Sequence, residues 1–283
     1  MAQDEAGYEL AVVLGGGGLL GAHEVGMLQA LAERGIRPDV VLGTSIGAVN
    51  GAFFAADPSP AGVQRLMEAW RESGARELSA AGTLRRLTTL ARSGTHVQSF
   101  LEIRDRLAEV LPVERIEELT VPFQCVAASI ERAAEHWFDS GPLAEVVLAS
   151  CAVPGVLPPI RIGDEHFIDG GIVNSIPVSR AVTLGAKKIY VLQVGRLEQA
   201  LKPPRWPWEV ALVAFEVARR HRFAYDLGSL PADVELHVMP TGGSAAPAYN
   251  DLAGALRLRR IAQTLERQID SAHEASLRYL DEL

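Results

Sequence analysis

Residues 10–28 read LAVVLGGGGLLGAHEVGML, and the order of residue types in this stretch indicates the fold. The apolar run at 10–14 stops at four consecutive glycines, which predicts a short, buried strand of a parallel sheet. From Ala22 to Arg34 apolar residues recur at helical spacing, and Gly35 closes that pattern. The stretch therefore predicts a strand, a bare glycine loop and a helix, in that order.

The next segments repeat this alternation. Residues 38–43 (PDVVLG) form a second apolar run, and residues 45–55 (SIGAVNGAFFA) are small and apolar, as in a helix buried against a sheet. A strand followed by a helix, twice over, is the start of a parallel sheet with crossover helices. The later elements that we expect are strands within 121–130, 136–140, 187–195 and 233–240, a hairpin at 161–171, and a helix at 143–155 that breaks at Pro154.

The length and composition fit one α/β domain. The chain has 283 residues, of which 48% are hydrophobic, and this is enough for one large core. We expect this core at about 8–240. Amphipathic segments without a strand pattern predict a helical insertion at about 59–111, and an apolar 3 and 4 spacing predicts a C-terminal helix at about 252–282.

Charge and hydropathy exclude several classes of protein. The net charge of −8 argues against a nucleic-acid-binding surface. No apolar run approaches 18 residues, and the acidic start MAQDEAGYEL lacks the pattern of a signal peptide, so we expect a cytoplasmic protein. Cys125 and Cys151 stand far apart without a CxxC pattern, and we expect buried free thiols rather than a disulfide or a zinc site.

The glycine loop has several interpretations. Gly16, Gly18 and Gly21 match GxGxxG, the fingerprint of dinucleotide-binding folds, but such a fold needs an acidic residue at the tip of the next strand. Here that strand ends in LGTSIG, without a carboxylate, and no Lys follows the glycines as in a phosphate-binding P-loop. A tight turn alone would need only one or two glycines.

The tip of the second strand carries Gly43, Ser45 and Gly47, a GxSxG pattern. In a nucleophile elbow the serine occupies a strained turn between strand and helix, and the flanking glycines avoid a collision with neighbouring chain. The predicted context matches, although an ordinary helix N-cap is the alternative for Ser45. Both loops would meet at the same sheet edge, where the amides of Gly17 and Gly18 could bind the oxyanion that serine attack creates. The loss of one such donor raises the activation barrier by about 3 to 4 kcal/mol.

A serine nucleophile also needs a base. None of the histidines after Ser45 stands in a constrained loop. These histidines are His96, His136, His166, His221, His237 and His273. One carboxylate stands out: Asp169 in FIDGG follows a short strand and precedes two glycines. Asp-Gly is also a common turn, but beside an elbow and a glycine loop we interpret Asp169 as the base.

Together these three patterns resemble the patatin-like phospholipase family, which combines a glycine-rich oxyanion loop, a GxSxG elbow and a downstream Asp-Gly-Gly or Asp-Gly-Ala. The likeness covers most of residues 10–195, in the segments GGGGLLGAHEVGMLQAL, VVLGTSIGAVNGAFFA, ASCAVPGVLPP and FIDGGIVNSIPVSRAVTLGAKKIYVLQVG. Residues 59–111 and those after about 200 match more weakly.

The resemblance implies a three-layer α/β/α fold with a mainly parallel central sheet and a helical insertion. It implies hydrolysis of lipid or lysolipid acyl esters by a Ser-Asp dyad, without histidine, metal or cofactor: Ser45 would be the nucleophile and Asp169 the base. A solvated Asp, with a pKa of about 3.9, is a poor base, but burial would raise that pKa. The resemblance further implies an oxyanion hole from the amides around Gly16, Gly17 and Gly18, and motif glycines at Gly21, Gly43, Gly47, Gly170 and Gly171.

Two features qualify this assignment. Leu20 stands where the family loop usually carries Lys or Arg, so a cation that could fix the loop or meet an anionic headgroup is missing. Residues 205–223 (RWPWEVALVAFEVARRHRF) suit either a membrane interface or a core helix with a solvated end, and we predict the core helix because the run from Val210 to Phe215 is unbroken.

The leading hypothesis is therefore a serine acyl hydrolase of patatin type that works through an acyl-enzyme. Acyl transfer to another alcohol would use the same site. A catalytically silent lipid-binding protein and a dinucleotide-binding protein are the alternatives from another class. Peripheral contact with a membrane stays open.

Overall fold

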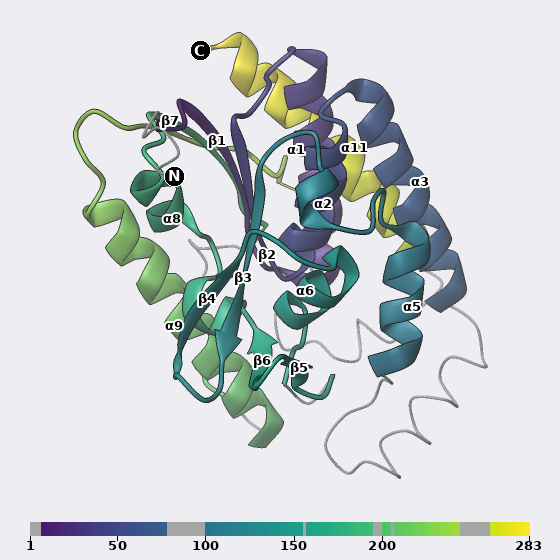
Figure 1. Cartoon of the computed structure of the whole chain (residues 1–283). Helices are drawn as coiled ribbons and strands as arrows, with labels where there is room; N and C mark the ends of the chain where they lie inside the picture. Colours follow the sequence, from purple (N-terminus) through teal and green to yellow (C-terminus); the bar gives the residue numbers. More distant parts are fainter. Residues whose placement is uncertain (1–6, 78–99, 155–156, 195–199, 205–206, 244–260) are drawn as a thin grey trace, which may run out of the picture.

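The computed structural model describes residues 7–77, 100–154, 157–194, 200–204, 207–243 and 261–283 (Figure 1). Within these residues the centre of the molecule is an eight-stranded sheet with the order β5-β6-β3-β2-β1-β7-β8, and β4 pairs with β3. The strands are β1 Leu10–Leu14, β2 Val40–Thr44, β3 Phe123–Ser129, β4 Ala134–Phe138, β5 Ile160–Ile162, β6 Glu165–Asp169, β7 Lys188–Leu192 and β8 Glu235–Val238.

The register of the sheet places the predicted motifs at one edge. Strands β3, β2, β1, β7 and β8 run parallel, so the loops after β1 and β2 meet at their shared carboxyl edge. Strand β6 runs antiparallel to β3. Thr44 pairs with Val126, and the next residue of β3, Ala127, pairs with Asp169. The residue after Thr44 and the end of β6 therefore lie on either side of β3.

Helices cover both faces of the sheet (Figure 1). On one face lie α1 Ala22–Glu33, α2 Ile46–Ala56, α3 Pro60–Glu77, α5 Phe100–Val110, α6 Leu143–Ser150 and α11 Ile261–Asp281. The other face carries α7 Gly171–Asn174, α8 Val178–Thr183 and α9 Pro207–Gly228. Two 3-10 turns, η1 Gly18–Gly21 and η2 Ile116–Glu118, complete the described elements.

Each face of the sheet has its own apolar core. Val12 and Leu14 of β1 point into the core beneath α1 and α2, whereas Ala11 and Val13 belong to the core beneath α8. All four side chains are inaccessible to solvent. A strand that is buried on both sides reads as a continuous apolar run, and this is why residues 10–14 show no alternation.

The predicted three-layer α/β/α arrangement with a mainly parallel sheet is confirmed. The strands and the hairpin predicted from the sequence are present, with bounds that differ by a few residues. The helix expected at 143–155 ends at Ser150, four residues before Pro154. Within the expected insertion 59–111 the structure has α3 and α5, and residues 78–99 lie outside the described part, as do 252–260 of the expected C-terminal helix.

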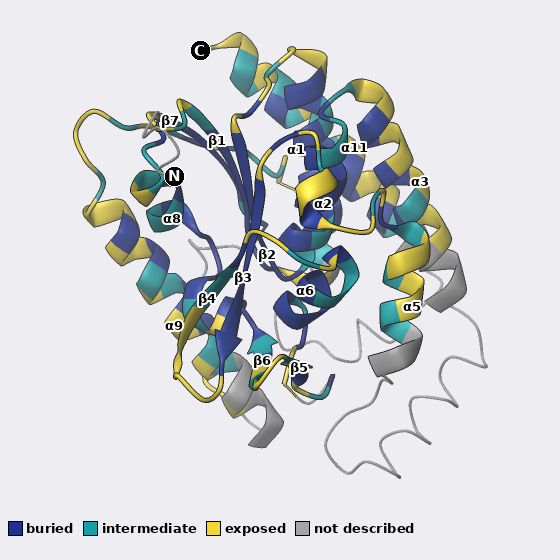
Figure 2. Cartoon of the chain, in the orientation of Figure 1, coloured by how far each residue is buried: buried dark blue, intermediate teal, exposed yellow. Residues whose placement is uncertain are grey.

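The prediction that 205–223 forms a core helix is wrong for part of its surface. The helix exists as α9, but Val210 is 53% exposed and Val217 is 52% exposed. Figure 2 shows exposed residues along the side of α9 that faces away from the sheet. None of the helices in the described ranges is both long and apolar enough to cross a bilayer.

The first and last described helices cross at a glycine. A Cβ atom on Gly26 of α1 would lie 2.1 Å from the carbonyl oxygen of Ile269 in α11 and 2.8 Å from the amide nitrogen of His273. Only glycine permits so close an approach of two helix backbones. Leu265, Ile269 and Ala272 of α11 are buried in the same core as α1.

Candidate active site

Ser45 occupies a sharp turn between β2 and α2. Its backbone has φ 55° and ψ −123°, a conformation that non-glycine residues rarely adopt. A Cβ atom on Gly43 would lie 2.5 Å from the carbonyl oxygen of Gly47, and one on Gly47 would lie 2.5 Å from that of Leu14. The two glycines therefore let the turn pack against itself and against β1, as a nucleophile elbow requires.

Asp169 reaches Ser45 from the end of β6. The Ser45 hydroxyl donates a hydrogen bond of 2.6 Å to Asp169 Oδ2, and the amide of Gly171 donates one of 2.7 Å to Asp169 Oδ1. Asp169 is 1% exposed and Ser45 is 8% exposed. Burial raises the pKa of Asp169 to about 6, although its hydrogen bonds to Ser45 and Gly171 act in the opposite direction.

A different close contact requires glycine at each of positions Gly170 and Gly171. A Cβ atom on Gly170 would lie 2.1 Å from the carbonyl oxygen of Val126 in β3. One on Gly171 would lie 2.7 Å from the ring of Phe215 in α9 and 2.9 Å from Asp169 Oδ1. Bare backbone at these two positions thus allows β6 to lie close to β3 and lets α9 approach the carboxylate.

The glycine loop lies directly against Ser45. A Cβ atom on Gly16 would lie 3.4 Å from the Cβ of Ser45. The amide of Gly16 donates to the carbonyl oxygen of Ser175, whereas within the described residues the amides of Gly17 and Gly18 have no backbone or side-chain acceptor. Gly18 has a left-handed backbone, φ 57°, and faces open space. Among the described residues, two of the three predicted amides thus have no acceptor.

A buried network anchors this loop, and sequence reasoning missed it. The Asn50 side chain of α2 donates to the carbonyl oxygen of Gly21 at 3.1 Å and to Glu24 Oε2 at 2.7 Å, and Trp70 of α3 donates to Asn50 Oδ1 at 2.9 Å. The Asn50 amide thus joins Glu24 of α1 to the end of the loop at Gly21. Gly21 itself lies against α2, where a Cβ atom would meet the Ile46 side chain at 2.6 Å.

Glu24 is wholly buried, and its burial raises the pKa of the carboxyl well above its usual range. This favours the uncharged acid. The carboxyl oxygen Oε1 has no hydrogen-bond partner within the described part of the chain. A glutamate in the first turn of the helix that follows the glycines was the sequence signal that could have indicated this network.

The end of helix α6 and the residue after it supply two further neighbours of Ser45. The amide of Ser45 donates to Ser150 Oγ at 2.9 Å, and Ser150 in turn donates to the carbonyl oxygen of Val126. Cys151 follows Ser150 in the chain, and burial together with the nearby Asp169 carboxylate raises the pKa of its thiol. Cys125 is a buried free thiol, as predicted. Cys151 is also free, but it lies at the candidate site, which its sequence context did not indicate.

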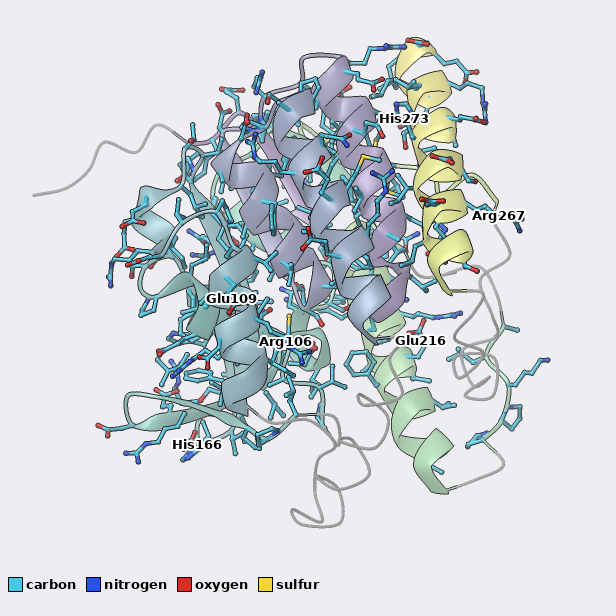
Figure 3. All side chains as sticks on the ribbon, turned by 90° about the vertical axis from the view of Figure 1, so that its right-hand side faces the viewer. Arg106, Glu109, His166, Glu216, Arg267 and His273 are labelled. Carbon is cyan, nitrogen blue, oxygen red and sulfur yellow. The ribbon has the colours of Figure 1, made fainter. Side chains whose placement is uncertain are left out.

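The histidines lie elsewhere. Figure 3 shows His166 and His273 at opposite ends of the molecule. His166 pairs with Glu131, His237 with Glu235, His273 with Glu33, and His136 contacts Arg132, whereas His221 is exposed on α9. His96 lies outside the described residues. Among the described histidines none hydrogen-bonds to Ser45 or Asp169, and the same residues contain no His, Cys, Asp and Glu cluster fit for a metal ion.

Comparison with known proteins gives consistent results. Residues 12–182 match the family model described as patatin-like phospholipase. The chain is 33% identical over 195 residues to "Patatin-like phospholipase domain-containing protein 7" of Rattus norvegicus, covering 68% of this chain and 14% of that protein. It is 32% identical over 199 residues to "Lysophospholipase nte1" of Emericella nidulans, covering 70% and 13%. The chain thus spans about one seventh of the length of these relatives.

Among solved structures, VipD from Legionella pneumophila has a similar fold. The TM-score is 0.50, with 16% sequence identity, and the alignment covers 97% of this chain and 67% of VipD. At this identity the likeness concerns the fold alone.

Proposed function

Because the chain belongs to the patatin-like phospholipase family, we propose that it is a serine hydrolase that cleaves acyl esters of lipids through a Ser45–Asp169 dyad. The observation that carries the proposal is the 2.6 Å hydrogen bond from the Ser45 hydroxyl to Asp169 Oδ2, made at a strained turn. The family implies a lipid substrate. The choice of an ester and of these two residues is the proposal.

In the first half of the reaction Ser45 Oγ attacks the ester carbonyl carbon, and its proton passes to Asp169 Oδ2. The carbonyl oxygen becomes an oxyanion, and the amides of Gly17 and Gly18 are the donors that we assign to it. The ester C–O bond then breaks, and the alcohol leaves with the proton from Asp169. Ser45 now carries the acyl group.

In the second half a water molecule attacks the acyl carbon and gives its proton to Asp169. The fatty acid leaves as Ser45 recovers its proton, so the dyad returns to its starting state. An alcohol in place of water would give acyl transfer at the same site.

The burial of Asp169 supports its role as a base. A carboxylate with an ordinary pKa holds a proton too weakly to withdraw one from a hydroxyl, and a raised pKa improves this driving force. The Gly171 amide holds the second carboxylate oxygen, so Oδ2 stays directed at Ser45. No described histidine stands within hydrogen-bond reach to do the same work.

The first substrate to test is a lysophospholipid, because one relative is named a lysophospholipase. Leu20 leaves the glycine loop without the usual cation, and for this reason neutral acyl esters belong in the same screen. We further propose that the chain forms one patatin-like domain, acts in the cytoplasm and meets its substrate at a membrane surface.

The test combines covalent labelling with turnover. A fluorophosphonate probe should label Ser45 in the wild-type chain, located by peptide mapping, and should not label Ser45→Ala. The wild type should hydrolyse p-nitrophenyl esters and lysophosphatidylcholine. A wild-type chain that takes no label, or a label that persists in Ser45→Ala, contradicts the proposal and favours a lipid-binding protein. Product found on an added alcohol instead of as free fatty acid identifies a transferase.

A further inference from the structure

Helix α9 turns apolar residues toward solvent. At 100° per residue, Val210, Ala214, Val217, His221 and Tyr225 fall on one side of the helix, and all five are exposed. Val210 is 53% exposed, Val217 52% and Tyr225 68%. This α9 stripe is about 22 Å long at 1.5 Å per residue, and no Asp, Glu, Lys or Arg lies within it.

From Glu216 to Asp226 the charged residues of α9 lie on the inner side or on the flanks. Glu216 is 3% exposed and pairs with Arg219 at 2.8 Å and with Arg220 at 2.9 Å. Asp226, 6% exposed, pairs with Arg222 at 3.0 Å. Arg220 and Arg222 border the stripe on its two sides. The usual arrangement of a surface helix is thus inverted in its described side chains.

The stripe belongs to the helix that contacts the candidate site. Phe215 of α9 lies against Gly171, whose amide binds Asp169 Oδ1. Beside Gly171, Ile172 of α7 is 37% exposed, and Val153, two residues after Cys151, is 38% exposed. Exposed apolar side chains therefore occur both at the candidate site and on the helix that borders it.

We infer that the α9 stripe is a docking surface for the face of a lipid bilayer, which it would enter to the depth of its valine and tyrosine side chains. The choice of a membrane rests on the proposed function, because a hydrolase of membrane lipids meets its substrate at a bilayer. The charges fit as well: the chain carries a net charge of −8, yet the described acidic groups of α9 are buried against arginines, so none repels an anionic headgroup.

A second copy of the chain fits this surface less well. A stable protein interface buries about 800 Å² on each partner. One helix face made mainly of valine and alanine offers on the order of a few hundred Å². A bilayer needs no complementary surface, and a stripe without Asp, Glu, Lys or Arg that has basic borders is typical of helices that lie in the interface.

The test is sedimentation of the full chain with vesicles of phosphatidylcholine alone and of phosphatidylcholine mixed with phosphatidylglycerol. The wild type should sediment with vesicles. Val210→Asp combined with Val217→Asp should lower the partition coefficient between vesicles and water about 100-fold. The double variant loses the favourable free energy of transferring two valine side chains from water into lipid. The control is Leu283→Asp, a 62% exposed apolar position on another part of the surface, which should bind like the wild type.

Both valine positions are exposed, so the double variant should keep the wild-type rate on a soluble p-nitrophenyl ester. If it unfolds, Val210→Asn with Val217→Asn gives the same comparison without added charge. Wild type that stays in the supernatant with both vesicles, or variants that bind equally, overturns the inference. A wild-type dimer at micromolar concentration that the double variant breaks would also overturn it, because the stripe would then be covered by a second copy.

Failure of the proposed function has a different signature. Sedimentation needs no catalysis, and Ser45→Ala should bind vesicles like the wild type. A chain that binds through the stripe but hydrolyses nothing contradicts the hydrolase proposal and leaves the docking surface in place. A chain that hydrolyses soluble esters but ignores vesicles does the reverse.

Discussion

Helices α2 and α9 both border the candidate site, but buried charged side chains occur on α9 and none occur on α2. Helix α2 begins one residue after Ser45 and buries apolar side chains such as Phe54, which is 1% exposed. Helix α9 touches the site through Phe215, buries Glu216 and exposes Val217. The difference indicates a division of roles: close backbone packing fixes the reacting groups, whereas charge pairs hold a helix whose apolar side stays available to its surroundings.

The largest effect should come from the reacting groups beside α2. Asp169→Asn keeps the shape of the side chain but cannot accept the Ser45 proton, and we expect kcat on a short p-nitrophenyl ester to fall about 1,000- to 10,000-fold. Val217→Asp on α9 should leave that rate within about twofold of the wild type. If Asp169→Asn kept its activity, another base would have to be sought.

The next contrast compares two buried glutamates. Glu216 faces two arginines, which hold its pKa below the usual value despite its burial. Glu216→Gln would leave Arg219 buried without a counter-charge and should lower the free energy of unfolding by about 3 to 5 kcal/mol. Glu24→Gln resembles the uncharged acid and should cost less than about 1 kcal/mol. Urea titration of both variants measures the contrast, and equal losses would contradict it.

Glycines at the two helices should also differ. Gly47→Ala would force a Cβ atom to within 2.5 Å of the Leu14 carbonyl oxygen, and we expect a loss of about 1 to 3 kcal/mol in stability. Gly228 ends α9 with no heavy atom within 4 Å of its Cβ position, so Gly228→Ala should be neutral within about 0.5 kcal/mol. Thermal unfolding of the pair is the measurement. A stable Gly47→Ala chain would show that the elbow is not tightly packed.

The smallest expected effect is the change of kcat/KM with each pH unit. Asp169, with a pKa of about 6, must be ionised to accept a proton, so kcat/KM on the soluble ester should fall about tenfold per pH unit below pH 6 and reach a plateau above it. His221→Gln on α9 is the control and should keep the same midpoint. A midpoint that moved in this variant would assign the profile to α9 instead.

Asp169 should affect stability in the opposite direction: the free energy of unfolding should fall as the pH rises, whereas the activity should increase. Because the folded-state pKa of Asp169 lies above its ordinary value of 3.8, the unfolded chain ionises first as the pH rises. The contribution of Asp169 to stability is therefore present below pH 4 and is lost between about pH 4 and pH 6. In Asp169→Asn this part of the stability profile should disappear.

Local chemistry explains which parts of the structure were predictable. Gly43, Ser45 and Gly47 act within five residues, so their spacing alone indicates the turn. Asp169 was predictable for the same reason, because its role follows from the strand before it and the glycines after it. Whether these residues perform the proposed chemistry stays a prediction that the labelling experiment tests.

The remaining features depend on contacts that spacing cannot reveal. Ser150 and Trp70 reach the site only because α6 and α3 pack there. The burial of α9 was misjudged because an apolar run ordinarily marks a core. The spacing of Glu216 and Arg220, and of Arg222 and Asp226, at i and i+4 was the available signal, since paired charges can be buried on the inner side.

The crossing of α1 and α11 at Gly26 has a consequence for synthesis on the ribosome. Helix α1 follows β1 in the sequence, but the helix that covers it comes after the whole sheet. Until residues 261–281 leave the exit tunnel, the face of α1 around Gly26 has no partner, and apolar surface of this kind favours chaperone binding during translation. The nascent chain thus completes the layer that supports the glycine loop only when α11 is made.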